Sequence, residues 1–193
     1  MNYYGGKQLA DAFRTVRKNT IQIAEEIPEE KYGFSPAPDT RTIAQTLAHI
    51  GVSTNFAYVV HSTRVTDMKT LNFGELFQNF AAEETRPRSK AELIEYLTAE
   101  GDKYASFLDG LDDEFLGETV TLPPGAEPSS RSRLEMLLSA KEHEMHHRGQ
   151  LMTLQRMIGQ VPHLTRQMQE RIAAMQAAAT PAQAAPAGAE AAR

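Results

Sequence analysis

The chain has 193 residues, of which 41% are apolar and 23% charged, a mixture typical of one soluble globular domain. The sequence has no cysteine, which excludes disulfides, thiolate metal ligands and a cysteine nucleophile, so any metal must be held by nitrogen and oxygen atoms. A formal net charge of −5, with a basic cluster only at residues 86–90, argues against binding to nucleic acid, and no apolar run is long enough to span a membrane. We therefore expect a cytoplasmic protein that binds neither nucleic acid nor membranes.

Two helices are predicted in the first third of the chain. Apolar and small residues spaced by three or four predict a helix over residues 6–27, which Pro28 ends. After the proline-rich turn "FSPAPDT", Thr42 and Gln45 fit a capping box, and a wide apolar face predicts a buried helix that continues to about residue 62.

The middle of the chain is predicted to contain a long connection and a third helix. Residues 64–88 break the helical pattern, apart from a short helix predicted around "FGELFQNFAAEE". Ser89 and Glu92 form a second capping box, and the helix that they begin ends near Gly110. The segment "GETVTLPPGAEPSS" is predicted to be a loop, because its alternation is brief and two prolines follow.

A third capping box, Ser132 with Glu135, predicts a helix of about seven turns that ends before Gly159. A last short helix, "TRQMQERIAAMQ", leads into a tail with few bulky side chains to bury. Four long amphipathic helices predict an all-α four-helix bundle with a long crossover between helices two and three. We assign residues 1–176 to this single domain and expect the Ala/Pro-rich residues 177–193 to be disordered.

Histidines gather in the stretch "KEHEMHHRGQL", residues 141–151. His143 and His147 are four residues apart, so their side chains lie on one face of a helix and can share one ion. His146 lies about 100° around the helix and is expected to flank the site. The stripe that carries the pair predicts that both imidazoles point into the bundle, since it continues through Met136, Ala140, Gln150, Leu154 and Met157.

This stretch also matches H-E-x-x-H, the pattern of zinc proteases, with Glu144 in the position of the general base. The extended metzincin pattern needs glycine at position 150 and histidine at position 153, where this chain has Gln150 and Thr153. The downstream glutamate of a gluzincin would have to be Glu170, which lies beyond Pro162. A protease is therefore not expected.

His49, in the middle of the second predicted helix, is the better candidate for a third ligand. A bundle that packs the second helix against the fourth long helix would bring His49 to His143 and His147. Three imidazoles leave coordination positions open, as in catalytic rather than structural sites, and suit zinc, nickel, copper or iron. The alternative is that His49 is a hydrogen-bonded core residue; His61 and His163 are expected at the surface.

The stretches "HEMHHRGQLMTLQRMIG" and "FSPAPDTRTIAQTLAHIGVSTNF" resemble the DinB family of DinB/YfiT-like metalloenzymes, over residues 5–160. The resemblance implies a four-helix bundle with a long crossover, often a homodimer. It also implies a divalent metal, zinc or nickel, bound by one histidine of helix two and an H-x-x-x-H pair of helix four, which match His49, His143 and His147. Some members resemble thiol S-transferases that use bacillithiol, mycothiol or a related low-molecular-weight thiol, and others are called hydrolases.

Three functions therefore stay open, all with a bound metal. The first is a thiol transferase acting on an electrophilic small molecule, with Gln150 orienting a ligand and Arg148 meeting an anionic group of the thiol. As alternatives, Gln150 hydrogen-bonds within the bundle and Arg148 pairs with Glu142 or Glu144 at the surface. The second is a hydrolase of small esters or amides, which needs a general base near the metal. The third is a non-catalytic stress protein in which the metal staples helices two and four.

Overall fold

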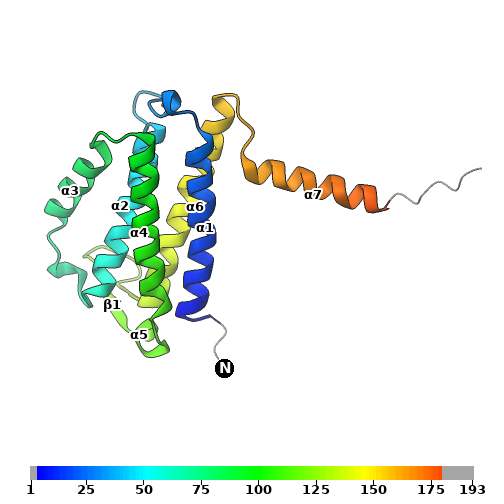
Figure 1. Ribbon diagram of the computed structural model, residues 1–193. Helices are drawn as coiled ribbons and strands as arrows, with labels where there is room; N and C mark the ends of the chain where they lie inside the picture. The colour runs from blue at the N-terminus through cyan, green and yellow to red at the C-terminus, as the bar shows by residue number, and fades with distance from the viewer. Residues whose placement is uncertain (1–3, 180–193) are drawn as a thin grey trace, which may run out of the picture.

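The computed structural model describes residues 4–179. Four long helices run side by side: α1 (Gly6–Glu26), α2 (Ile43–Ser62), α4 (Lys90–Asp109) and α6 (Arg133–Met157) (Figure 1). Helices α1 and α2 each pack against both α4 and α6. The predicted four-helix bundle is therefore confirmed, and the packing of α2 on α6 is the contact that a shared metal site requires.

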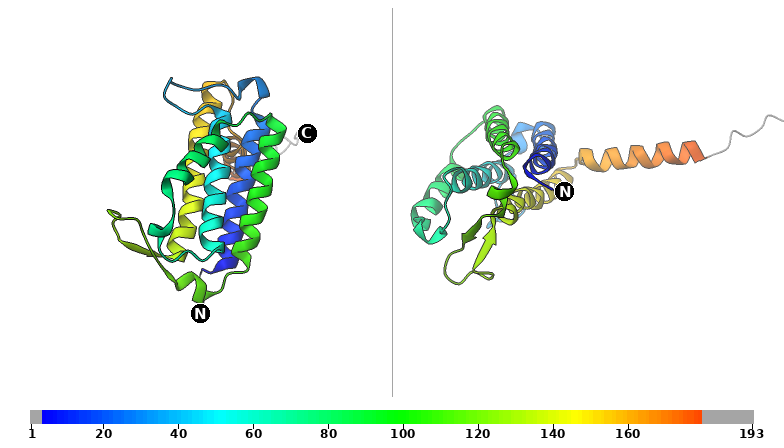
Figure 2. Two further views of the ribbon diagram at one scale, coloured as in Figure 1. Left: turned by 90° about the vertical axis from the view of Figure 1, so that its left-hand side faces the viewer. Right: turned by 90° about the horizontal axis from the view of Figure 1, so that it is seen from below.

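The crossover between α2 and α4 contains the one-turn helix η2 (Met68–Thr70) and the helix α3 (Phe73–Thr85). Helix α3 lies outside the bundle against α2 (Figures 1 and 2) and has no buried residue. The ring of Phe80 on α3 packs edge-on against Phe56 on α2, with centroids 5.4 Å apart. The predicted short helix is thus present, and it covers one side of α2.

Helix starts follow the predicted capping residues. Complete capping boxes form at Thr42 with Gln45 and at Ser89 with Glu92. At the start of α6 only the serine half forms: Ser132 accepts a hydrogen bond from the backbone N–H of Glu135. A short 3-10 helix, η1 (Glu29–Lys31), follows α1.

The segment after α4 that the sequence predicts to be a loop contains regular secondary structure, so that prediction was wrong. The short helix α5 (Asp113–Gly117) leads into this segment, the strand β1 (Thr119–Thr121) lies within it, and its antiparallel partner β2 (Ser130–Ser132) begins at its last residue. Strand β2 has a weak strand propensity, so its pairing depends on the rest of the fold. The fully buried Val120 anchors β1, and the backbone N–H of Thr121 donates to the carbonyl of Thr66 at 2.9 Å.

Two apolar clusters fill the bundle, one around Ile23, Leu47 and Leu97 and the other around Phe13, Tyr104 and Leu137. The buried ion pair of Arg17 on α1 with Glu144 on α6 lies between these two clusters. Both bonds of this bidentate pair measure 2.9 Å.

Other groups complete the surroundings of this ion pair. Arg17 also donates to Thr54 Oγ1 at 2.7 Å and to the carbonyl of Leu97. Gly101 leaves the room that Arg17 needs, since a Cβ there would come within 2.9 Å of its Cγ. Glu144 is therefore neither a surface partner of Arg148 nor the general base of a protease.

Helix α7 (His163–Ala179) leaves the bundle and points away from it (Figures 1 and 2). Its apolar side chains Met168, Ile172 and Met175 are exposed, as is Glu170. Of the predicted disordered tail, residues 177–179 belong to α7 and residues 180–193 lie outside the described residues. Within residues 4–179, no helix is both long enough and apolar enough to cross a bilayer.

Candidate metal centre

His49, His143 and His147 converge between α2 and α6. Nε2 of His143 lies 3.1 Å from Nε2 of His49 and 3.1 Å from Nε2 of His147. One ligand nitrogen from each of the three histidines lies within 4.8 Å of the others. The structure thus brings together the three histidines that the sequence analysis selected, and this cluster could hold a metal ion.

Glu84 on α3 orients the imidazole of His49. Its carboxylate accepts a hydrogen bond from Nδ1 of His49 and another, of 2.8 Å, from Nε of Arg41. Because a carboxylate only accepts, Nδ1 of His49 carries the proton and Nε2 is left with a free lone pair. A carboxylate behind a histidine in this way fixes the ring and raises its basicity as a ligand.

Gln150 plays the same part for His147, one turn along α6. Its Oε1 accepts from Nδ1 of His147 at 2.7 Å, while its Nε2 lies 3.1 Å from Nε2 of His146. The second lone pair therefore also sits on Nε2, facing His143. Gln150 therefore orients the imidazole of His147. His146 flanks the cluster, as predicted.

The donor set fits a divalent cation. Nε2 of His49 and Nε2 of His147 both direct lone pairs toward Nε2 of His143, an arrangement that repels unless a proton or a cation lies between them. Nitrogens about 2.1 Å from a tetrahedral ion are roughly 3.4 Å apart. This is close to the 3.1 Å that separates Nε2 of His143 from Nε2 of His49 and from Nε2 of His147. Three neutral imidazoles suit zinc or nickel and leave at least one position open.

Burial keeps the cluster in the protonation states that a metal needs. Burial, together with the neighbouring imidazoles, lowers the pKa of His143 to about 4. Burial also lowers the pKa of His147, although the hydrogen bond to Gln150 opposes this. For Glu84, burial would raise the pKa, but the hydrogen bonds from Arg41 and His49 outweigh it and lower the pKa. His143 and His147 are thus neutral, and Glu84 is charged, near pH 7.

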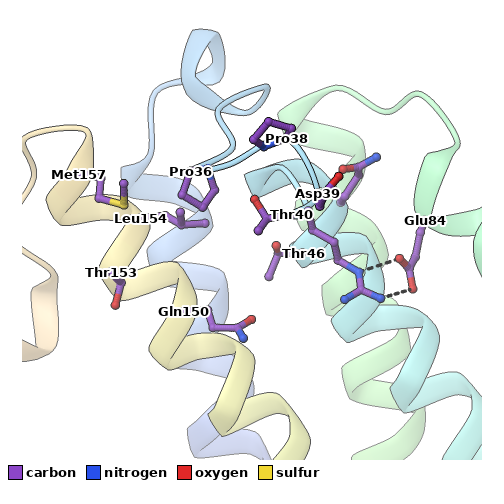
Figure 3. Close-up of a pocket in the computed structure, with 12 residues that line it drawn as sticks. Pro36, Pro38, Asp39, Thr40, Thr46, Glu84, Gln150, Thr153, Leu154 and Met157 are labelled. Atoms are coloured by element: carbon purple, nitrogen blue, oxygen red, sulfur yellow. Dashed lines mark hydrogen bonds and ion pairs between the residues drawn. The ribbon is translucent and has the colours of Figure 1, made fainter.

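Two cavities adjoin the cluster. The first, of about 900 Å³, has the Arg41–Glu84 ion pair on one wall and Gln150 on the other (Figure 3). The second, of about 420 Å³, is mainly apolar and has His143 in its wall beside Phe56 and Phe80. The histidine cluster therefore lies where the first cavity, called the polar cavity below, approaches the second, called the apolar cavity.

The α6 stripe predicted to point into the bundle lines these cavities, and Leu154 within it also belongs to the buried core. Met136 and Ala140 face the apolar cavity, and Gln150, Leu154 and Met157 face the polar one. Met157 is 54% exposed, which a core position would not allow. The same spacing marks a core stripe and a cavity wall, because both are apolar faces turned toward the neighbouring helices.

Other sequence-based assignments differ from the structure. His61 and His163, expected at the surface, are each only 1% exposed. Neighbouring elements cover both: His61 Nδ1 lies 3.2 Å from Nη1 of Arg133, and His163 Nε2 lies 3.2 Å from Oδ1 of Asn19. Arg148 lines neither of the two cavities next to the histidines.

A family model described as the DinB superfamily matches residues 12–151. The chain belongs to the DinB superfamily. Among its relatives, "Uncharacterized protein YjoA" of Bacillus subtilis (strain 168) is 27% identical over 155 residues, which cover 79% of this chain and 90% of that protein. All three histidines of the cluster lie within the residues that the family model matches.

Solved structures share the DinB fold. The crystal structure of the DinB-like protein YjoA from Bacillus subtilis has a TM-score of 0.60 at 23% identity and covers 80% of this chain and 94% of its own. A conserved protein from Enterococcus faecalis gives a TM-score of 0.58 at 16% identity, with coverages of 77% and 93%. A protein from Clostridium difficile 630 gives 0.59 at 16% identity, with coverages of 81% and 98%. At these identities the likeness concerns the fold alone.

Proposed function

We propose that this DinB-superfamily protein is a metal-dependent enzyme that transfers a low-molecular-weight thiol, of the bacillithiol or mycothiol type, to an electrophilic small molecule. The observation that carries the proposal is the convergence of three imidazole nitrogens, with His143 in the wall of the apolar cavity and Glu84 and Gln150 in the wall of the polar one. A divalent ion held by His49, His143 and His147 would supply a Lewis acid that lowers the pKa of a coordinated thiol.

The two cavities offer separate places for two reactants. The polar cavity, with Arg41, Gln45 and Thr46 in its wall, suits a thiol that carries hydroxyl, amide or carboxylate groups. The apolar cavity suits the electrophile and excludes water from it. The thiol sulfur forms a bond to the electrophilic carbon, the leaving group departs with the electron pair of the broken bond, and the thiol proton goes to solvent.

Hydrolysis of a small ester or amide is the alternative use of such a centre. It needs a general base, such as a carboxylate, that is free to accept a proton from water. The carboxylate beside the histidines is Glu84, which the sequence analysis did not anticipate near the site. Because Arg41 and His49 occupy both of its oxygens and lower its pKa, Glu84 is a weak base, which favours thiol transfer.

A purely structural metal is the third reading. Structural zinc sites are usually closed by four protein ligands. Among residues 4–179 the cluster contains three candidate ligands, which favours an open site.

The homodimer implied by the DinB resemblance remains a prediction that light scattering would check.

The test is a conjugation assay with metal-loaded protein, monochlorobimane as the electrophile, and bacillithiol, mycothiol, glutathione or cysteine as the thiol. We expect conjugation well above the uncatalysed rate with at least one thiol, and its loss in His147→Ala. Hydrolysis of p-nitrophenyl acetate by the metal-loaded protein, without any thiol conjugation, would favour the hydrolase instead. Metal-loaded protein that catalyses neither thiol conjugation nor hydrolysis would favour the hypothesis of a purely structural metal.

A further inference from the structure

The apolar cavity beside His143 lies between α2, α3, α6 and the β1–β2 hairpin. Figure 2 shows α3 and the hairpin on the same side of the bundle, and both contribute residues to the cavity wall beside the two long helices. Phe56, Phe80, Val60 and Met136 supply much of its wall. Its volume of about 420 Å³ falls within the range of small-molecule sites.

Arg131 on β2 brings a cationic group into this apolar wall. It pairs across the hairpin with Val120, and cross-strand partners point to the same face of a sheet. Since Val120 is fully buried, Arg131 also points toward the protein interior, and it lines the cavity. Its Nε is buried without a hydrogen-bond partner among the described residues. An arginine so placed is costly unless a ligand supplies an acceptor.

Arg133 and His61 extend this donor group. Arg133 is fully buried; it donates to Oε2 of Glu118 at 2.7 Å and to Nδ1 of His61 at 3.2 Å, and its Nη2 has no partner among residues 4–179. Because arginine only donates, Nδ1 of His61 accepts, and the proton of the neutral ring is on Nε2. His61 lines the cavity, so its ring adds an N–H donor to the same wall.

The charges at this end of the cavity do not balance. Glu118 is the carboxylate that pairs with Arg133, at 2.7 Å, and it also pairs with Arg64, at 3.5 Å. Arg131 adds a further positive charge with no ion-pair partner among the described residues. Arg133 is buried, Arg131 half-buried and Arg64 largely exposed. This excess of positive charge favours an anion over a neutral or cationic ligand.

We infer that this cavity binds an amphipathic organic acid, whose carboxylate is held by Arg131 and His61 and whose apolar body extends along Phe56 and Phe80 toward His143. This inference deepens the proposed function, on which it rests for one point: the bound acid is the acceptor of the thiol. Its electrophilic carbon is then at the end away from the carboxylate, next to the histidine cluster.

The test measures binding of octanoate to metal-free protein, so that neither a thiol nor a metal ion enters the experiment. Isothermal titration calorimetry gives the affinity, with octan-1-ol as the uncharged analogue. Methyl NMR of methionine-labelled protein locates the ligand, because Met68 and Met136 line the apolar cavity and Met157 lines the polar one. Arg131→Gln is the test variant, and Arg86→Gln, at an exposed position on the crossover, is the matched control for the lost charge.

We expect octanoate to shift the methyl signals of Met68 and Met136, and to bind at least tenfold more weakly to Arg131→Gln than to the wild type or Arg86→Gln. Octan-1-ol should lose less than about twofold in affinity in the same variant. Absence of octanoate binding, a shift confined to Met157, or equal affinities for octanoate and octan-1-ol in the wild type would overturn the inference. The comparison of octanoate with octan-1-ol in the wild type tests the inference even if Arg131→Gln fails to fold. A negative thiol-transfer assay with positive octanoate binding would sink the proposed function and leave the acid site in place.

Discussion

The carboxylate of Glu84, on the helix of the crossover, holds Nδ1 of His49, in the middle of α2. This contact connects α3, which buries none of its own residues, to the histidine cluster of the bundle. Arg41, just before α2, holds the other oxygen of the same carboxylate at 2.8 Å. The crossover therefore contributes to the centre without supplying a ligand.

Replacing Glu84 should weaken metal binding while the ligand set stays intact. Glu84→Ala frees the ring of His49 and lowers its basicity, and loss of such a partner typically costs about 10-fold to 100-fold in metal affinity. Competition against a chromogenic zinc chelator measures the change. Glu75→Ala, also on α3 but exposed, should keep the wild-type affinity, and equal affinities in both variants would mean that Glu84 does not support the site.

The ligand set itself can be tested by metal content. Protein purified without chelator should carry about one divalent ion per chain, measured by mass spectrometry. His49→Ala and His147→Ala should each lose most of it, because two imidazoles hold such an ion poorly. His146→Ala should retain it, since His146 reaches Gln150 rather than the convergent nitrogens. A folded wild type that takes up no metal on reloading would reduce the three histidines to packing residues.

Helical periodicity predicted which histidines lie close together, because the geometry within each helix is local. His143 and His147 lie one turn apart on α6, and His49 lies on the face of α2 that the bundle turns toward α6. Glu84 could not be predicted in this way. Its position depends on how an exposed helix docks on α2, which no spacing within the crossover records.

The buried polar residues were missed for a related reason. The sequence pattern places Glu144 at the surface, because its partner Arg17 lies 127 positions away in the chain and has no local signal. His61 lies near the end of α2, where a helix is often exposed, but Arg133, at the start of α6, covers it. Long-range ion pairs and capping elements leave no periodic signal, so sequence patterns miss them.

The Arg17–Glu144 pair should be important for stability, because either charge alone would remain buried without a partner. Glu144→Gln and Arg17→Met are each expected to lower the free energy of unfolding by about 3 to 5 kcal/mol. The double variant should lose less than the sum of the two, since no lone charge remains. Urea unfolding measures all three. The exposed Glu142→Gln should change stability by less than about 0.5 kcal/mol, and a similarly small effect of Glu144→Gln would contradict the buried pair.

The buried His61 should make the metal-free protein less stable in acid. Burial, and to a lesser degree the charge of Arg133, lower the pKa of His61 from 6.5 to about 4 in the folded chain. Between these two values the unfolded chain binds a proton that the folded chain excludes, so stability is lost as the pH falls from about 6.5 toward 4.

His61→Gln removes this contribution while His143, His147 and His163, whose pKa values are also lowered, stay in place. Between pH 7 and pH 5, the loss of unfolding free energy in urea should therefore be about 2 kcal/mol smaller in the variant than in the wild type. Parallel pH profiles would show that His61 is protonated in the fold or exposed to water. A protonated ring would also leave Arg133 without its acceptor on Nδ1 of His61.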